Sequence, residues 1–268
     1  MRLALIIFSL AFVNGMALAQ QAVENLRHGY TIDIPDGWHE VPSDFLTEFG
    51  RSVSAPGQSI NYVAGYQETP FEDALVYPYV LIQSIAYRDF GLNRPPTNDE
   101  MGDVVKAILG MDITEALEGT AAADVAEPVD DNPPISLVSF DNAAGVFVYD
   151  LNIAVADVGD VRGRARGEFG FRALMQPAFF ALQPTWTELE PQANTLLESF
   201  EFWPDYAYPE KDSSKASEIE LEGMTEYEAP RSHVIPIVLG GIAILVFALA
   251  AFLGVRLIRE NKTRSQSD

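Results

Sequence analysis

The stretch YTIDIPDGWHEVP, residues 30–42, combines a strand pattern with a tight turn and a large aromatic side chain. Apolar and polar residues alternate up to the proline, which is the pattern of a strand buried on one face. The next residues, Pro35, Asp36 and Gly37, predict a turn, because proline pre-sets φ and glycine accepts a positive φ. Trp38 then returns the chain to the apolar side, so we expect it to anchor the core at the first corner of the fold.

The N-terminal end of the 268-residue chain is strongly apolar and is predicted to be a targeting segment. Residues 1–19 contain one arginine, an apolar run and the sequence Ala17-Leu18-Ala19, which fits the A-x-A cleavage pattern of a secretory signal peptide. A spanning N-terminal helix is the alternative, and it is disfavoured because the apolar run is short and is broken by Asn14-Gly15.

The C-terminal end predicts a membrane anchor. Residues 234–255 are 22 residues without a charge, and as a helix they would extend about 33 Å, enough to span a bilayer core. Four basic residues lie in the tail that follows, residues 256–268, and an acidic, serine-containing stalk, residues 206–233, precedes the helix. Because positively charged flanks stay in the cytoplasm, we expect residues 20–205 to form an external domain and the tail to be internal.

The charge of the external part is strongly negative. Residues 20–233 hold 37 acidic and 12 basic residues, which gives a net charge of −25 (12 minus 37). Such a surface repels nucleic acid, which we exclude as a partner, and it would attract cations or basic partners, although solubility alone also accounts for it. The chain has no cysteine, and its sequon, Asn261-Lys262-Thr263, lies in the predicted tail. These features predict a bacterial inner-membrane protein with a periplasmic domain.

Strands and helices alternate along the predicted domain. Runs rich in β-branched and aromatic residues predict strands at 30–34, 59–67, 77–87, 145–155, 161–172, 179–184 and 200–203. Apolar residues at helical spacing predict helices at 43–49, 97–110 and 186–200. Ser43 is expected to cap the first helix and Gly50 to end it, and Thr97 and Glu100 form a predicted capping box on the second.

The run VRGRARGEFGFR, residues 161–172, carries the main candidate binding residues. Its odd positions are apolar or glycine, so we expect a hairpin with residues 145–155 through a loop of three or five residues. A symmetric register would place Asp150 opposite Arg166 and Asn152 opposite Arg164. The even positions form an arginine stripe: Arg162, Arg164, Arg166 and Arg172. The stripe could bind an anionic ligand, but cross-strand pairing with acids such as Asp150 is the favoured interpretation.

A second candidate is the acidic, proline-rich loop predicted at 119–134. Its oxygen-bearing side chains are Asp124, Glu127, Asp130, Asp131 and Asn132. They could ligate Ca²⁺, but they lack EF-hand spacing, and a solvated loop is the favoured interpretation.

Motifs for catalysis or for transition metals are missing from the sequence. The three histidines, His28, His39 and His233, have no second histidine or cysteine at ligand spacing. The chain contains no G-x-S-x-G, Walker or G-x-G-x-x-G motif. We therefore assign no catalytic, cofactor-binding or metal-binding residues and no cofactor.

The order of these elements resembles the PsbP-like superfamily, which includes the extrinsic lumenal protein of photosystem II and bacterial envelope proteins. Its members open with a strand followed by P-x-x-W and close with a helix ending in SF, here Ile34-Pro35-Asp36-Gly37-Trp38 and Ser199-Phe200. The resemblance covers roughly residues 28–203. It implies an α+β fold, an antiparallel sheet with helices on its faces, and a role in binding or assembly rather than catalysis. The predicted membrane anchor departs from the soluble members of the family.

Two functional hypotheses follow. The first is a membrane-anchored periplasmic interaction or assembly module without catalytic activity, whose partner is another envelope protein. The alternative is an extracytoplasmic binding domain for a cation such as Ca²⁺ or for a small anionic solute, which rests on the acidic loop and the arginine stripe.

Overall fold

A computed structural model describes residues 20–54, 60–110, 126–128 and 134–208. The predicted signal peptide, membrane helix and tail lie outside these residues, as does all but the first part of the predicted stalk. Within the described ranges, no helix is both long and apolar enough to cross a membrane.

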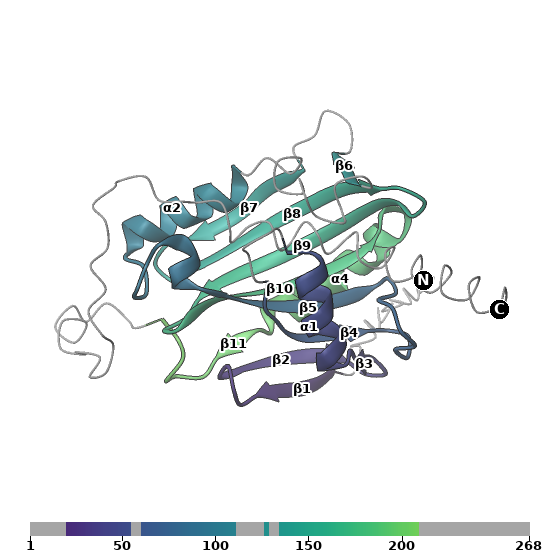
Figure 1. Cartoon of the computed structure of the whole chain (residues 1–268), viewed down its shortest axis with the longest axis horizontal. Coiled ribbons are helices and arrows are strands. Elements are labelled where there is room, and N and C mark those ends of the chain that lie inside the picture. Colours follow the sequence, from purple (N-terminus) through teal and green to yellow (C-terminus); the bar gives the residue numbers. More distant parts are fainter. Residues whose placement is uncertain (1–19, 55–59, 111–125, 129–133, 209–268) are drawn as a thin grey trace, which may run out of the picture.

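A large antiparallel sheet forms the centre of the domain (Figure 1). Its strand order is β3-β4-β5-β10-β9-β8-β6, and β7 pairs with the same edge of β8 as β6 does. The strands are β3 (His39–Glu40), β4 (Tyr62–Gln67), β5 (Tyr79–Ala86), β6 (Ala126–Pro128), β7 (Ile135–Asp141), β8 (Val146–Val155), β9 (Gly159–Phe169) and β10 (Ala173–Leu182). The strands β8 and β9 alternate buried and partly exposed side chains, so one of their faces is more open to solvent. The central strands β5 and β10 are buried almost throughout, as strands covered on both faces are.

A second, three-stranded sheet joins the two ends of the domain. Its order is β1 (Gln20–Asn25), β2 (Tyr30–Pro35) and β11 (Glu201–Phe202), all antiparallel. The opening stretch of the sequence therefore forms the middle strand of this small sheet, and the residues after the last helix pair with it.

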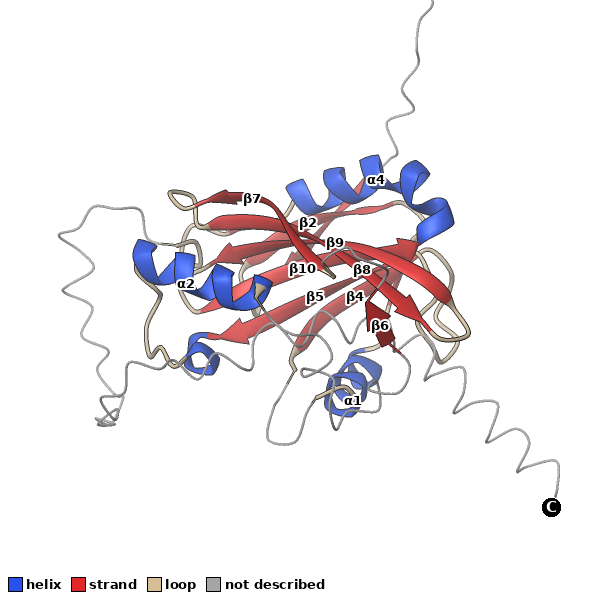
Figure 2. Ribbon diagram, turned by 90° about the horizontal axis from the view of Figure 1, so that it is seen from above, coloured by secondary structure: helices blue, strands red, loops and turns tan. Residues whose placement is uncertain are grey.

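The helices are α1 (Ser43–Ser52), α2 (Asn98–Leu109) and α4 (Gln183–Glu198), with a short 3₁₀ turn, η1 (Tyr87–Phe90). Two apolar clusters occupy the two faces of the large sheet. One contains residues of α1 and α2, and the other contains residues of α4 and the small sheet. Figure 2 shows α4 and α1 on opposite sides of the sheet. The predicted α+β class with antiparallel sheets is confirmed.

Some predictions that rest on residues close together in the sequence are confirmed and others are wrong. The capping box of α2 is present: Thr97 accepts from the backbone N–H of Glu100, and the Glu100 carboxylate accepts from the N–H of Thr97 at 2.7 Å. The helix α1 begins at Ser43 as predicted, but its predicted cap and its predicted end are wrong. Pro42 occupies the N-cap position without a side-chain cap, and the helix continues past Gly50 to Ser52. Gly50 does not end the helix but allows close packing, because a Cβ there would lie 2.5 Å from the carbonyl oxygen of Ile60.

The hairpin of β8 and β9 has the predicted parity but a different register. Three residues separate the last paired positions, Val155 and Gly159. Asp150 therefore lies opposite Arg164 and not Arg166, and Asn152 lies opposite Arg162. The symmetric register was wrong because the turn closes early: Asp157 adopts φ 61° and Gly159 adopts φ 103°, a left-handed turn geometry.

Four strands were not predicted. These are β1, β3, β6 and β7, and β6 lies within the segment predicted to be a loop. β10 also begins six residues before the predicted start at Phe179, at Ala173. β1 has the mostly exposed sequence QQAVEN, which lacks a hydrophobic alternation and becomes a strand by pairing along the whole of β2.

Two glycines of β9 make room for large rings in the core. A Cβ on Gly167 would lie 2.1 Å from the ring of Phe147, and a Cβ on Gly163 would lie 2.8 Å from the ring of Phe180. The Gly-x-x-x-Gly spacing within the arginine-rich run therefore serves core packing, since these aromatic rings need the space of a missing side chain.

Candidate functional site

The centre of the arginine stripe is an internal ion-pair network. Arg164 Nε and Nη2 donate to the two carboxylate oxygens of Asp150 at 2.6 and 2.9 Å. Its Nη1 reaches two residues of α4, Asn194 at 2.7 Å and Glu190 at 3.0 Å. The hydrogen bonds that Arg164 donates to Asp150 raise the pKa of Arg164, so the guanidinium stays charged. The bidentate pair joins β8 to β9 and is 12% exposed on both sides. The contacts of Arg164 Nη1 with Asn194 and Glu190 tie α4 to the sheet.

The neighbouring arginines are also occupied. Arg166 pairs with Glu168 at 2.8 Å, and Arg162 lies over the ring of Trp186 at 5.5 Å from its centroid. Arg172 stands apart from the other three: it is exposed and lies over the ring of Tyr206 at 5.0 Å. The favoured prediction for the stripe, pairing with Asp150, is confirmed for Arg164. The stripe is therefore not an open anion site as a whole.

The predicted cation ligands are not assembled by the described part of the chain. Side chains of the acidic loop, including Asp124 and Asp130, lie outside the described residues. Within the described ranges no group of three or more His, Asp or Glu side chains could hold a metal ion.

The opening turn has the predicted geometry. Trp38 N–H donates to the carbonyl of Pro35 at 3.2 Å, and Gly37 adopts φ 82°. The Trp38 ring packs on Phe179 of β10, with ring centroids 5.8 Å apart. Trp38 is half-buried, so it is an anchor at the edge of the core and has one side free for other contacts.

That free side lines a groove of about 540 Å³. The groove lies between β1 and the edge strands β3 and β4, with Ile34, Trp38 and Ala64 among its apolar lining residues. In Figure 1 these strands lie together at the edge of the domain. The volume is within the range of roughly 300–1,000 Å³ that is usual for ligand and peptide pockets.

Polar groups gather along the same groove. Glu40 is the cross-strand partner of Tyr66, and Asn25 Nδ2 donates to the hydroxyl of Tyr30 at 3.2 Å. Burial, and then the charge of Glu40, raise the pKa of Tyr66 to about 12. Its hydroxyl therefore stays protonated at neutral pH and can donate a hydrogen bond. Glu24 and Arg27 also line the groove, so its charged residues are two acids and one base.

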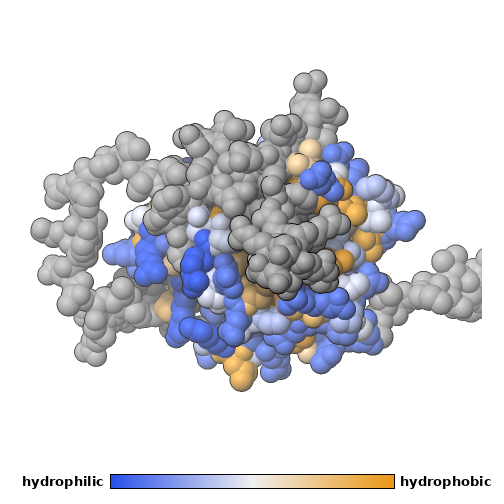
Figure 3. Space-filling model, turned by 45° about the vertical axis from the view of Figure 1, so that its right-hand side comes forward, coloured by the Kyte–Doolittle hydropathy of each residue, from blue (hydrophilic) through white to orange (hydrophobic). Residues whose placement is uncertain are grey.

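On the outer surface shown in Figure 3, hydrophilic residues predominate and hydrophobic ones form small separate groups. Isolated apolar residues of this kind are normal for a soluble surface. The groove differs from this surface because it combines a half-buried aromatic ring, a concave shape and acidic side chains at one place.

The face covered by α1 and α2 contains a pair of buried amides. Gln176 and Gln83 are opposite one another on β10 and β5 and are 0% and 3% exposed. Among the described residues, neither amide atom of Gln176 has a hydrogen-bond partner, and neither does the side-chain oxygen of Gln83. Such groups destabilise a fold unless a partner is supplied.

Comparison with known proteins finds similarity to solved structures alone. No family model and no curated protein matches the chain. Cyanobacterial PsbP (CyanoP) from Synechocystis sp. PCC 6803 is similar over 72% of this chain and 99% of its own, with 14% identity and a TM-score of 0.39. LpqN, involved in cell envelope biogenesis of Mycobacterium tuberculosis, is similar over 69% and 91%, with 15% identity and a TM-score of 0.32. The Saccharomyces cerevisiae Ran-binding protein Mog1p covers 69% and 96%, with 13% identity and a TM-score of 0.31.

The groove itself was not predicted. One wall is β1, whose polar sequence gave no signal, and the opposite wall comes from residues about 40 positions later. Of the residues that line it, Ile34, Pro35 and Trp38 belong to the stretch that the sequence marked as the first corner of the fold.

Proposed function

We propose that the domain is a periplasmic interaction module, held in the bacterial inner membrane by residues 234–255, that binds a basic, extended segment of another envelope protein. In this proposal residues 1–19 are the signal peptide, residues 206–233 the stalk and residues 256–268 the cytoplasmic tail. The proposal assigns no catalytic step to the domain.

The observation that carries the proposal is the groove beside Trp38. The indole ring of Trp38 and the neighbouring apolar side chains form a surface on which an aliphatic or aromatic residue of the partner can pack. Aromatic side chains at such places contribute strongly to binding at interfaces. Glu24 and Glu40 offer acceptors for a lysine or arginine of the same segment, and Tyr66 offers a hydroxyl donor for its backbone.

The charge of the whole domain supports a basic partner. The net charge of −25 over residues 20–233 produces a negative field that attracts positive segments and increases their rate of encounter. Arg164 and Arg166 do not oppose this field at the groove, because each is paired with an acid and neither lines the groove.

Site-specific photo-crosslinking in living cells tests the proposal. A photoreactive amino acid replaces Val63, which lines the groove, and in a second strain it replaces Ala144, an exposed residue in the turn between β7 and β8. We expect an adduct with a specific envelope protein at Val63 and none at Ala144. Mass spectrometry of the adduct should identify a segment with lysine or arginine.

Charge reversal distinguishes specific binding in the groove from nonspecific association with the acidic domain. The combined change E24K and E40K should abolish the Val63 adduct, whereas E198K, on the exposed end of α4, should leave it intact. Equal adducts at Val63 and Ala144, or an adduct that survives the groove reversal, would refute the proposal. Protease accessibility of residues 20–205 in spheroplasts, with and without residues 234–268, independently tests the topology.

A further inference from the structure

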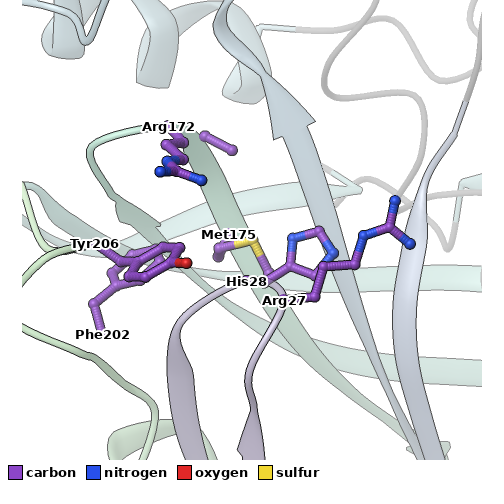
Figure 4. A pocket seen from close by; sticks show the side chains of 7 residues that line it. Arg27, His28, Arg172, Met175, Phe202 and Tyr206 are labelled. Carbon is purple, nitrogen blue, oxygen red and sulfur yellow. The ribbon is translucent and has the colours of Figure 1, made fainter.

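A smaller hollow lies where three separate segments of the domain meet. It is lined by Arg27 and His28 of the β1–β2 turn, Arg172 and Met175 at the start of β10, and Phe202 and Tyr206 near the end of the domain. Figure 4 shows Arg172, Tyr206 and His28 arranged around Met175, whereas the guanidinium of Arg27 extends away from Arg172.

The walls of this hollow are held by backbone contacts. Phe171 N–H donates to the carbonyl of Tyr206 at 2.7 Å, and Trp203 N–H donates to the carbonyl of Gly29 at 2.8 Å. Gly29 has φ 64°, and a Cβ there would lie 2.1 Å from the ring of Tyr206. The three segments are therefore fixed against one another, and the hollow does not depend on flexible surface side chains alone.

The hollow concentrates positive charge in an acidic domain. Within the described part of the chain, neither Arg27 nor Arg172 forms an ion pair with an acid. Glu168, opposite Met175 on the neighbouring strand, is paired with Arg166. Burial, and secondarily the charge of Arg27, lower the pKa of His28, so the imidazole is neutral at neutral pH and can donate one hydrogen bond.

The size of the hollow limits what it can hold. Its volume of about 40 Å³ is roughly three times the ~10–15 Å³ that one water requires. It is far below the ~300 Å³ of a pocket for a metabolite. It therefore suits one compact group of a few heavy atoms. The donors around it are a guanidinium, an imidazole and a phenol hydroxyl, which together match an oxyanion.

We propose that Arg172, His28 and Tyr206 form a binding site for a phosphate group. This site is separate from the groove and does not depend on the interaction function proposed above. Phosphate can come from a free ion or from a phospholipid headgroup.

Histidine-selective NMR on the full chain in a nonionic detergent tests the site. The chain has only three histidines, so H28Q assigns the His28 signal and His39 serves as an internal control. We expect inorganic phosphate to shift the His28 signal saturably, and sodium chloride of equal ionic strength not to do so. R172Q should weaken phosphate binding by about tenfold, because a charge-assisted hydrogen bond is lost. R51Q removes an exposed charge from α1 and should have no effect.

A second titration with a soluble short-chain phosphatidylglycerol distinguishes the two sources. A lipid response at lower concentration than phosphate, lost in R172Q, supports a headgroup site, and a response to phosphate alone supports a free-ion site. The proposal is overturned if neither probe moves the His28 signal, or if R172Q and R51Q change the response equally. Unchanged His39 shifts and melting temperature in R172Q would show that the variant is folded.

Discussion

The ion pair between Asp150 and Arg164 gives the most quantitative prediction for this fold. D150N removes the charge that holds Arg164 while keeping the shape of the side chain. Exposed ion pairs contribute about 0–1 kcal/mol, whereas breaking a buried pair costs about 3–5 kcal/mol. Both side chains are 12% exposed, which places this pair near the buried limit.

Two partners that Arg164 would keep in D150N reduce the expected loss of stability. Arg164 would keep Asn194 at 2.7 Å and Glu190 at 3.0 Å, although the Glu190 side chain is 40% exposed and so a weaker partner. We therefore expect D150N to lower the free energy of unfolding by about 2–3 kcal/mol. For a domain of this size that corresponds to a fall in melting temperature of roughly 5–10 °C.

Urea denaturation of residues 20–208, which contain both core clusters, measures this change. The midpoint should fall without a change in the slope, because the surface exposed on unfolding is the same. E190Q is the matched control and should cost less than about 1 kcal/mol, since that acid is more exposed. R164M combined with D150N should cost less than the sum of the two single changes, because the pair acts as a unit.

The result that refutes this reasoning is a small effect of D150N, below about 0.5 kcal/mol, or a larger effect of E190Q. Either outcome would mean that α4 holds the arginine and that the cross-strand carboxylate is incidental. Additivity of the two changes would lead to the same conclusion.

Three further predictions follow from the packing and the titrating groups. G167A should destabilise the domain by about 1–3 kcal/mol, because its Cβ would overlap an aromatic ring, whereas G102A on α2, where a Cβ meets nothing within 4 Å, should be stabilising; urea midpoints compare the two. Q176L should raise the free energy of unfolding by roughly 1–2 kcal/mol, since it removes a buried amide without partners in the described structure, and a loss of stability would show that the amide is satisfied. The hydrogen bond from Arg94 lowers the pKa of Glu100 in the folded state, so the ionised Glu100 stabilises the fold fully above pH 4.5, its ordinary pKa, and this stabilisation is lost as the pH falls through the lower pKa of the folded state. E100Q should therefore cost at most about 1 kcal/mol at neutral pH and make the free energy of unfolding less dependent on pH in this acidic range, which acid unfolding curves measure.

Features determined within a few residues could be predicted from the sequence. The capping box needs only Thr97 and Glu100, three positions apart, and the turn after β2 needs only Pro35 and Gly37. Tertiary contacts explain the errors. Gly50 resembles a helix stop, but it is small because the Ile60 carbonyl passes close to it.

The candidate sites were harder to predict because they are built from strands with weak sequence signals. The β8–β9 register depends on where the turn closes, and a shift of two residues keeps every side chain on its face, so hydrophobic pattern alone does not distinguish the registers. The same pattern correctly separated the arginines from the core positions, but it could not show that Arg172 would leave the stripe and join His28 from a turn 144 residues earlier.

Trp38, at the first corner of the fold, both packs in the core and lines the groove. Its ring packs on Phe179 and so contributes to the core on the α4 side of the sheet, and the turn before it contains Pro35 and Gly37. Its other side, together with Pro35, lines the groove. A substitution that changes the groove at this corner therefore also changes the core, whereas substitutions at Val63 or Glu40 change the groove without removing a core ring. The binding chemistry of the groove can consequently vary through its β3 and β4 wall while the corner, and with it the fold, stays the same.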